Sequence, residues 1–179
     1  MSAVTWSRVE PIEPERYDVA GFDCGRPSVD EWFQESAEAA SHLVSTHLCL
    51  DDNEVIQGFF TLKTVIVAAE GLPKKIARKV PGAQEPGAQA TGILLAQMGL
   101  DVSNRGKGMG KHLFREATRK AVEAHAASRH QLFVTDAADE DEKLVSWYQT
   151  AGLTRLADSF RLVAPMGALV KAHANTVAL

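Results

Sequence analysis

The chain has 179 residues, which suits a single domain, here residues 1–179, large enough to bury a core. Apolar residues make up 45% and charged residues 23%, and no apolar run approaches the roughly 20 residues of a membrane span. The net charge of −4 does not indicate nucleic-acid binding by the protein as a whole. The two cysteines lack metal-ligand spacing and the N-terminal residues lack a secretory pattern, so we expect a cytoplasmic protein without a metal.

The first part of the chain predicts a short strand and then a helix. Residues 6–20 have the composition of a strand and a turn, broken by prolines. Ser28 and Glu31 have the spacing of a capping box, in which a hydroxyl and a carboxylate satisfy amides at a helix start. We therefore expect a helix from Val29 to about His42, with its aromatic residues on the buried face.

A hairpin and a basic insert follow. Residues 46–50 and 55–62 are apolar runs on either side of an acidic turn, which predicts two antiparallel strands. Residues 73–92 are interrupted by prolines and are expected to form a loop-rich insert. The front of this insert predicts a short helix with four basic side chains: Lys74, Lys75, Arg78 and Lys79.

A strand, a glycine-rich turn and a helix are predicted for the centre of the chain. Residues 92–100 form an apolar run typical of a buried strand, and the turn of residues 105–110 (RGKGMG) comes shortly after it. Apolar positions then recur at helical spacing over residues 108–127. The expected buried stripe of this helix consists of Leu113, Phe114, Ala117, Ala121 and Ala124.

The last part of the chain predicts further strands around one helix. Residues 131–135 have the apolar content of a strand, and the acidic residues after it favour the start of a helix over residues 140–150. Residues 160–164 and 168–170 are expected to supply closing strands. The order of elements predicts a mixed α/β domain.

The glycine-rich turn is the strongest candidate for a binding site. The first amides of a helix have no partner inside it, and the helix dipole places partial positive charge there. Glycines let an anion approach these amides, and Arg105, Lys107 and Lys111 add full charges nearby. A phosphate loop of the GxxxxGK(S/T) type is excluded because His112 follows Lys111. The turn therefore predicts binding of a phosphate, and in particular of a pyrophosphate.

The spacing of Arg105, Gly108 and Gly110 gives the pattern (R/Q)xxGx(G/A), which resembles the coenzyme A signature of the GNAT superfamily of N-acetyltransferases. The resemblance covers nearly the whole chain and implies a mixed, mostly antiparallel sheet flanked by helices, with a splayed central strand. It also implies acetyl-CoA as the cofactor, held by the backbone of that strand and of the turn. The implied cofactor-binding residues are Leu95, Ala96, Gln97, Met98, Gly99, Leu100, Arg105, Gly106, Lys107, Gly108, Met109, Gly110 and Lys111.

A second segment carries the implied catalysis. Residues 147–153 (WYQTAGL) resemble the family segment (F/W/Y)YxxxGF, whose tyrosine hydroxyl faces the thioester sulfur. A phenol of pKa about 10 is protonated at neutral pH, so Tyr148 can act as a general acid toward the leaving thiolate. The alternative is that Tyr148 is a core aromatic residue on an amphipathic helix. The candidates for accepting the proton of the amine are Asp136, at the end of a predicted strand, and water.

A narrower resemblance concerns residues 22–33 (FDCGRPSVDEWF). They are similar to the acetyltransferase toxins of bacterial toxin–antitoxin pairs, which acetylate the free amine of aminoacyl-tRNA. The resemblance implies that the basic residues Lys74, Lys75, Arg78 and Lys79 contact tRNA phosphates. It also implies a small antitoxin protein as a partner and, because dimers are common in the family, a homodimer.

Two other functions remain open. In one, the acceptor is an amine on a protein or a small molecule. In the other, the chain is a non-catalytic coenzyme A-binding module that keeps the fold. Replacement of Tyr148 by phenylalanine separates the last case, because an enzyme would lose turnover and keep its affinity for acetyl-CoA.

Overall fold

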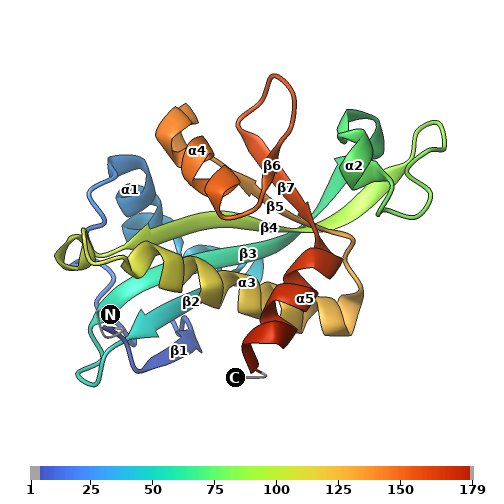
Figure 1. Cartoon of the computed structure of the whole chain (residues 1–179). Helices are drawn as coiled ribbons and strands as arrows, with labels where there is room; N and C mark the ends of the chain where they lie inside the picture. Colours follow the sequence, from blue (N-terminus) through green and yellow to red (C-terminus); the bar gives the residue numbers. More distant parts are fainter. Residues whose placement is uncertain (1–4, 178–179) are drawn as a thin grey trace. The chain divides into compact units, whose positions relative to one another are not determined.

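The computed structural model of the chain describes residues 5–177. Residues 1–4, which bear on the expectation that no secretory signal is present, lie outside the described residues. No helix in the described part of the chain is both long and apolar enough to cross a bilayer. In chain order the elements of Figure 1 are β1 (Arg8–Pro11), α1 (Pro27–Ser36), η1 (Ala39–His42), β2 (Ser45–Leu50), β3 (Ile56–Ala68), η2 (Ala69–Gly71), α2 (Lys74–Ala77), β4 (Gln89–Leu100), η3 (Val102–Asn104), α3 (Met109–Ser128), β5 (Leu132–Asp136), η4 (Ala138–Glu140), α4 (Glu142–Thr150), β6 (Thr154–Arg155), β7 (Arg161–Pro165) and α5 (Met166–Val177).

Seven strands form one mixed sheet in the order β1-β2-β3-β4-β5-β7-β6. The pairs β1–β2, β2–β3, β5–β7 and β6–β7 are antiparallel, whereas β4 and β5 are parallel. Parallel neighbours need a crossover connection, which α3 supplies. This arrangement confirms the predicted α/β class, with a mixed and mostly antiparallel sheet flanked by helices.

The chain divides into two compact units. The first unit comprises Met1–Lys63 and Ala96–Ala117, and the second comprises Thr64–Leu95 and Thr118–Leu179. The elements β3, β4 and α3 each continue from one unit into the other. Each unit contains fully buried aromatic side chains, so each has a core of its own.

An aromatic cluster forms the core of the first unit. Phe33 stacks on Phe59 with ring centroids 4.0 Å apart, and Phe22 meets both rings edge-on. Phe33 comes from α1, which begins at Pro27 because the fixed φ of proline suits the first helical position. The helix buries Val29 and Phe33, which lie four residues apart and therefore on one face.

The predicted start of α1 is wrong. The capping box of Ser28 and Glu31 does not form, because the helix already begins at Pro27 and Ser28 lies inside its first turn. The residue before Pro27 makes no capping hydrogen bond through its side chain. The α-helix also ends earlier than predicted, at Ser36, and a separate 3-10 turn runs to His42.

Two predictions for the second unit are also wrong. Residues 168–170 are helical, as part of α5, and not a strand. The segment is rich in alanine, the strongest helix former, and lacks the alternation of a half-buried strand. In α3, Ala124 was predicted to be buried but is exposed. The next residue on the face of the buried Ala121 is His125, four positions later, and its side chain is half-buried.

Candidate functional site

The glycine-rich turn connects β4 to α3 within the first unit. Gly106 and Gly108 have positive φ angles of 72° and 75°, which residues with a Cβ rarely adopt. A Cβ at either position would meet no atom within 4 Å, so the glycines serve the backbone path and open space lies beside it. α3 begins at Met109, and the first amides of a helix have no partner inside it. The turn therefore presents amide donors and a positive dipole end to an anion.

Polar contacts hold the chain just before the turn. Asp101 accepts hydrogen bonds from the amide and the hydroxyl of Ser103 and so caps the 3-10 turn η3. The buried amide of Asn104 donates to the side-chain oxygen of Gln57 at 2.8 Å. Gln57 in turn donates to Asp51 at 3.0 Å, in the turn between β2 and β3. These bonds tie the entrance of the glycine-rich turn to the β2–β3 hairpin.

Two hydrogen bonds join the glycine-rich turn and the preceding η3 to the loop before α1. The Nη2 atom of Arg105 donates to the carbonyl oxygen of Cys24. The amide of Val102 donates to the carbonyl oxygen of Asp23 at 2.9 Å. The arginine of the motif is thus engaged with backbone of its own protein, and the exposed side chains of Lys107 and Lys111 carry the remaining charge of the turn.

Gly25 makes the contact of Arg105 possible. A Cβ on Gly25 would lie 2.5 Å from Nη2 of Arg105, and the φ of Gly25 is 70°. The neighbouring Cys24 is buried, and its amide donates to Asp30 at 2.7 Å. Burial, with a smaller effect of the nearby Asp30 carboxylate on the thiol, raises the pKa of the Cys24 thiol to about 12. This cysteine therefore has a packing role and is not a nucleophile at neutral pH.

The pairing of β4 with β5 ends at Leu95. The register of β4 with β5 runs from Gly92 opposite Leu132 to Leu95 opposite Thr135, although β4 continues to Leu100. At the last pair, the buried hydroxyl of Thr135 donates to the carbonyl oxygen of Leu95 at 3.2 Å. β4 therefore runs on beyond its last pair with β5, in line with the splayed central strand.

Tyr148 lies on α4 in the second unit and is only 3% exposed. Its ring meets that of Trp147 edge-on, with centroids 5.1 Å apart. The helix ends at Thr150, two residues before Gly152, the glycine predicted to stop it. Beyond this end, the amide of Leu153 donates to the carbonyl oxygen of Tyr148 at 3.1 Å. The helix and its end are as the sequence predicted, and the burial of Tyr148 is compatible with both roles considered for it.

Asp136 forms a two-point ion pair with Arg161. The Nε and Nη2 atoms of Arg161 donate to the two carboxylate oxygens at 2.7 Å each. These hydrogen bonds raise the pKa of Arg161. Both residues line a pocket of about 740 Å³ together with Glu140 and Phe160. Because both oxygens of Asp136 are engaged, it is poorly suited to accept a proton from an amine, which favours water for that step.

The basic insert of the second unit presents its charges to solvent. Ile76 and Ala77 of α2 are buried and anchor the short helix. The basic side chains on α2 and directly after it are all exposed: Lys74, Lys75, Arg78 and Lys79. The structure thus brings together the four residues that the sequence predicted as a group.

The predicted site residues are divided between the two units. Residues 96–100 and 105–111 follow one continuous path in the first unit, whereas Leu95, Tyr148 and the basic insert belong to the second. Among residues 5–177, no group of three or more His, Cys, Asp or Glu side chains is placed to hold a metal ion.

The residues that support the turn were not predicted from the sequence. The D-x-S spacing of Asp101 and Ser103 is typical of a side-chain turn and would have indicated the first of them. The contact of Asn104 with Gln57 spans 47 positions, and that of Thr135 with Leu95 spans 40. Contacts of this range leave no local signal in a single sequence.

The strand order, the parallel β4–β5 pair joined by α3 and the glycine-rich turn at the start of α3 define the class of protein as one with the GNAT fold. Solved structures share it. A tyrosine-to-phenylalanine mutant of KacT matches with a TM-score of 0.80 and 22% identity, covering 92% of this chain and 98% of that chain. AtaT complexed with acetyl-methionyl-tRNAfMet matches with a TM-score of 0.79 and 18% identity, covering 93% and 98%. These likenesses confirm the predicted fold.

Two curated relatives have the names of a toxin and a probable toxin. The tRNA-acetylating toxin of Mycobacterium tuberculosis is 32% identical over 110 residues, which are 60% of this chain and 61% of the relative. The probable toxin TacT of Sinorhizobium fredii is 28% identical over 115 residues, 63% of this chain and 61% of the relative. The chain thus matches less than two thirds of the length of either relative, and no family model matches it. The predicted resemblance to the acetyltransferase toxins is confirmed.

Proposed function

We propose that this protein is an N-acetyltransferase that moves the acetyl group of acetyl-CoA to the free amine of aminoacyl-tRNA. The observation that carries the proposal is the glycine-rich turn, whose positive-φ glycines open the first turn of α3 to an anion. The choice of acceptor is supported by the relative described as a tRNA-acetylating toxin and by the solved complex of AtaT with acetyl-methionyl-tRNAfMet.

The proposed acetyl-CoA site follows the backbone from β4 to α3. The open space beside Gly106 and Gly108 and the exposed charges of Lys107 and Lys111 fit a pyrophosphate. The backbone of residues 95–100 lies at and beyond the last pair of β4 with β5, which suits the amides of a pantetheine arm. AtaTR bound with acetyl-CoA has the same fold, with a TM-score of 0.77 and 19% identity over 93% of this chain and 97% of that chain.

Arg105 has a different part in this proposal from the two lysines. Its guanidinium donates to the carbonyl oxygen of Cys24, so it holds the turn in place. The amides of the turn and of the first turn of α3 then meet the phosphates in a fixed geometry. Fixed donors bind an anion more tightly than mobile ones because less ordering is needed on binding.

Tyr148 is the proposed general acid. When bound, acetyl-CoA supplies a thioester whose carbon–sulfur bond breaks as the amine attacks the acetyl carbon. The Oη atom of Tyr148 donates its proton to the departing sulfur, a contribution of typically ~10²–10⁴-fold in rate. The proton of the attacking amine passes to water, because Asp136 is held by Arg161.

The basic insert is the proposed contact with the RNA backbone. Lys74, Lys75, Arg78 and Lys79 are exposed and lie close together in sequence, which suits neutralisation of successive phosphates. The net charge of −4 makes this local cluster the more important, because the protein as a whole does not attract a polyanion.

We further propose that a small antitoxin binds this protein. The support is the likeness in fold to AtaT bound to the C-terminus of the antitoxin AtaR and to the KacTA–DNA complex.

We also propose that residues 1–179 act as one domain, because β3, β4 and α3 run through both units. A cytoplasmic location is proposed from the acceptor and from the two buried cysteine thiols, and a homodimer stays a prediction.

The test is transfer of labelled acetyl groups from acetyl-CoA into total aminoacylated tRNA, with the Tyr148→Phe variant beside the wild type. The other tyrosine of the chain provides a matched control. Tyr17→Phe removes a hydroxyl that donates to Glu10 at 2.8 Å, away from the proposed catalytic segment in sequence. Binding of acetyl-CoA is measured for all three proteins by calorimetry.

Label that enters charged tRNA, is lost with Tyr148→Phe and is kept with Tyr17→Phe supports the proposal. Absence of label in tRNA, with acetyl-CoA still bound, contradicts the proposed acceptor and points to amines of proteins or small molecules. Binding of acetyl-CoA without transfer to any amine would instead identify a coenzyme A-binding module.

A further inference from the structure

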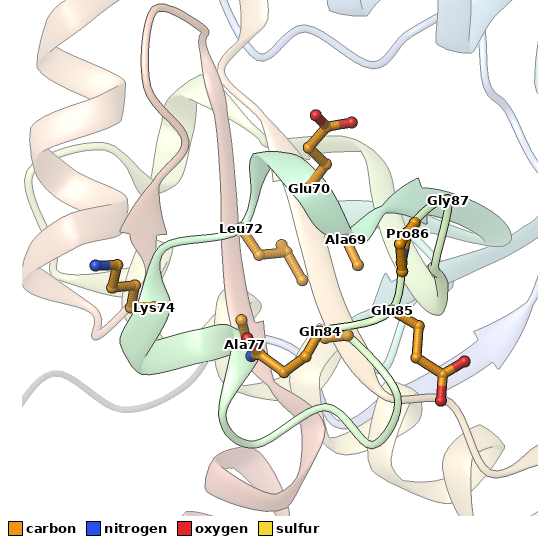
Figure 2. Close-up of a pocket in the computed structure, with 10 residues that line it drawn as sticks. Ala69, Glu70, Leu72, Lys74, Ala77, Gln84, Glu85, Pro86 and Gly87 are labelled. Atoms are coloured by element: carbon orange, nitrogen blue, oxygen red, sulfur yellow. The ribbon is translucent and has the colours of Figure 1, made fainter.

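A pocket of about 410 Å³ lies within the basic insert of the second unit (Figure 2). It is lined by η2, by α2 and by the loop of residues 83–87. Its size falls within the ~300–1,000 Å³ of small-ligand sites. Neither the acetyl-CoA site nor Tyr148 contributes to its lining, so the pocket has no role in the proposed transfer chemistry.

The pocket combines an apolar floor with one amide side chain. Ala69, Leu72 and Ala77 line it and are buried, which makes them fixed parts of the fold. Pro86 adds an apolar rim, and the exposed Gln84 supplies both a donor and an acceptor. A flat group with an apolar face and a polar edge matches this lining.

Basic side chains gather beside the pocket, whose own lining holds one cation, Lys74, and two carboxylates, Glu70 and Glu85. Residues 71–84 contain four basic side chains, among them Lys74 in the lining, and no acidic one. Glu70 and Glu85 also line the pocket, but Figure 2 shows their carboxylates directed away from its middle, where Leu72 and Gln84 lie. A ligand with a neutral group in the pocket and negative charge outside it is favoured.

We propose that this pocket binds an unpaired nucleobase of an RNA, while the exposed cations of the insert neutralise the adjoining phosphates. The proposal rests on the proposed function and deepens it. The apolar floor contacts the face of the base, and the amide of Gln84 pairs with its edge. A base inside a duplex has both faces covered by its neighbours, so the pocket selects single-stranded nucleotides.

The test compares two RNA stem-loops that differ only at the 3′ end, one with unpaired nucleotides and one blunt. Their dissociation constants for the full chain are measured by fluorescence anisotropy over a range of salt concentrations. Ala83→Phe fills the pocket without a change of charge, and Gln84→Ala removes the edge contact at an exposed position. Ala127→Phe makes the same substitution at an exposed position of α3 outside the lining, as the matched control.

We expect the wild type to bind the RNA with unpaired nucleotides about tenfold more tightly than the blunt RNA. Ala83→Phe and Gln84→Ala reduce this preference, and Ala127→Phe retains it. Lys75→Ala lowers the affinity for both RNAs by the same factor, because it removes a phosphate contact and no base contact. It also reduces the slope of log affinity against log salt concentration by about one.

Equal affinity of the wild type for the two RNAs overturns the proposal, and so does a preference that survives Ala83→Phe and Gln84→Ala. Loss of a co-purified protein partner in Ala83→Phe, with the RNA preference intact, overturns it in favour of a protein-docking pocket. Acetylation of charged tRNA is measured on the same variants. If the wild type acetylates charged tRNA but binds the two RNAs equally well, only the pocket proposal is rejected. If it neither binds RNA nor acetylates charged tRNA, the proposed function is rejected as well.

Discussion

The guanidinium of Arg105 donates a hydrogen bond to the carbonyl oxygen of Cys24, 81 positions earlier in the chain. A bond from a charged donor is stronger than one between neutral groups. It fixes the glycine-rich turn to the loop before α1, and the missing side chain of Gly25 leaves the space for it. The motif arginine is therefore a support of the turn.

We expect Gly25→Ala to weaken this support. A Cβ there would lie 2.5 Å from Arg105 Nη2, and the φ of 70° is unfavourable for alanine by about 1–2 kcal/mol. The free energy of unfolding should fall by at least that amount, and the affinity for acetyl-CoA should fall with it. Denaturant titration and calorimetry measure both. Gly71→Ala, where a Cβ meets no atom within 4 Å, should change neither, and an unaltered Gly25→Ala would contradict the role of the contact.

Thr135→Val should lower the free energy of unfolding, because Thr135 makes a side-chain hydrogen bond at the last β4–β5 pair. The substitution keeps the shape of the side chain but removes the hydroxyl that donates to the carbonyl oxygen of Leu95. Loss of a buried hydrogen bond costs about 1–3 kcal/mol when one partner is left behind. Denaturant unfolding measures the loss, and Thr154→Val on β6, at a half-exposed position, serves as the control. Equal stability of the two variants would show that the carbonyl has other donors.

The Cys24 thiol should be inert in the folded protein. Burial raises its pKa to about 12, so almost none of it is thiolate at pH 8, and the reactive form of cysteine is the thiolate. Cys49 is buried as well. A disulfide reagent should therefore react slowly with the native protein and rapidly with both thiols in guanidinium. A fast reaction in the native state that disappears in Cys24→Ser would be inconsistent with this burial.

The stability of the second unit should decline in mild acid because of His130. Burial, with a smaller effect of nearby His125, lowers the pKa of His130 below the ordinary value of 6.5. The unfolded chain then binds a proton at a higher pH than the folded chain does. The free energy of unfolding is thus maintained above pH 6.5 and falls as the pH drops through that value toward the folded-state pKa.

Denaturant unfolding at pH 7.5 and at pH 5.5 measures this dependence. His130→Gln should flatten this dependence. It also removes the hydrogen bond of 3.2 Å between His130 Nε2 and Thr64 Oγ1, so the free energy of unfolding of this variant should be lower at both pH values. His42→Gln, at an exposed position, should leave the dependence as it is. A wild type whose stability is the same at both pH values would refute the shift.

The backbone of the proposed acetyl-CoA site could be predicted from the sequence because it depends on local patterns. The apolar run of β4, the positive-φ glycines 106 and 108 and the helical spacing of α3 all lie within one stretch of chain. The helix that carries Tyr148 was predicted for the same reason, since its acidic start and Gly152 mark both ends.

The supports of the site could not be predicted in this way. The partner of Arg105 lies in another segment, and nothing near position 105 in sequence indicates it. Local signals also competed at α1, where Pro27 at the first helical position took precedence over the capping pattern of Ser28 and Glu31. At α5, residues 168–170 form a short apolar run that also suits a strand, but the alanines of the segment favour a helix.

The crossover from β4 to β5 also bears on how this protein folds. The two strands are parallel, and Leu95 and Thr135 can pair only after the chain of 40 positions that separates them has closed into a loop. Such non-local pairs form late, and until then the buried side chains of β5 stay exposed to aggregation. We therefore expect this protein to refold more slowly, and with more loss to aggregation, than an all-helical protein of the same length.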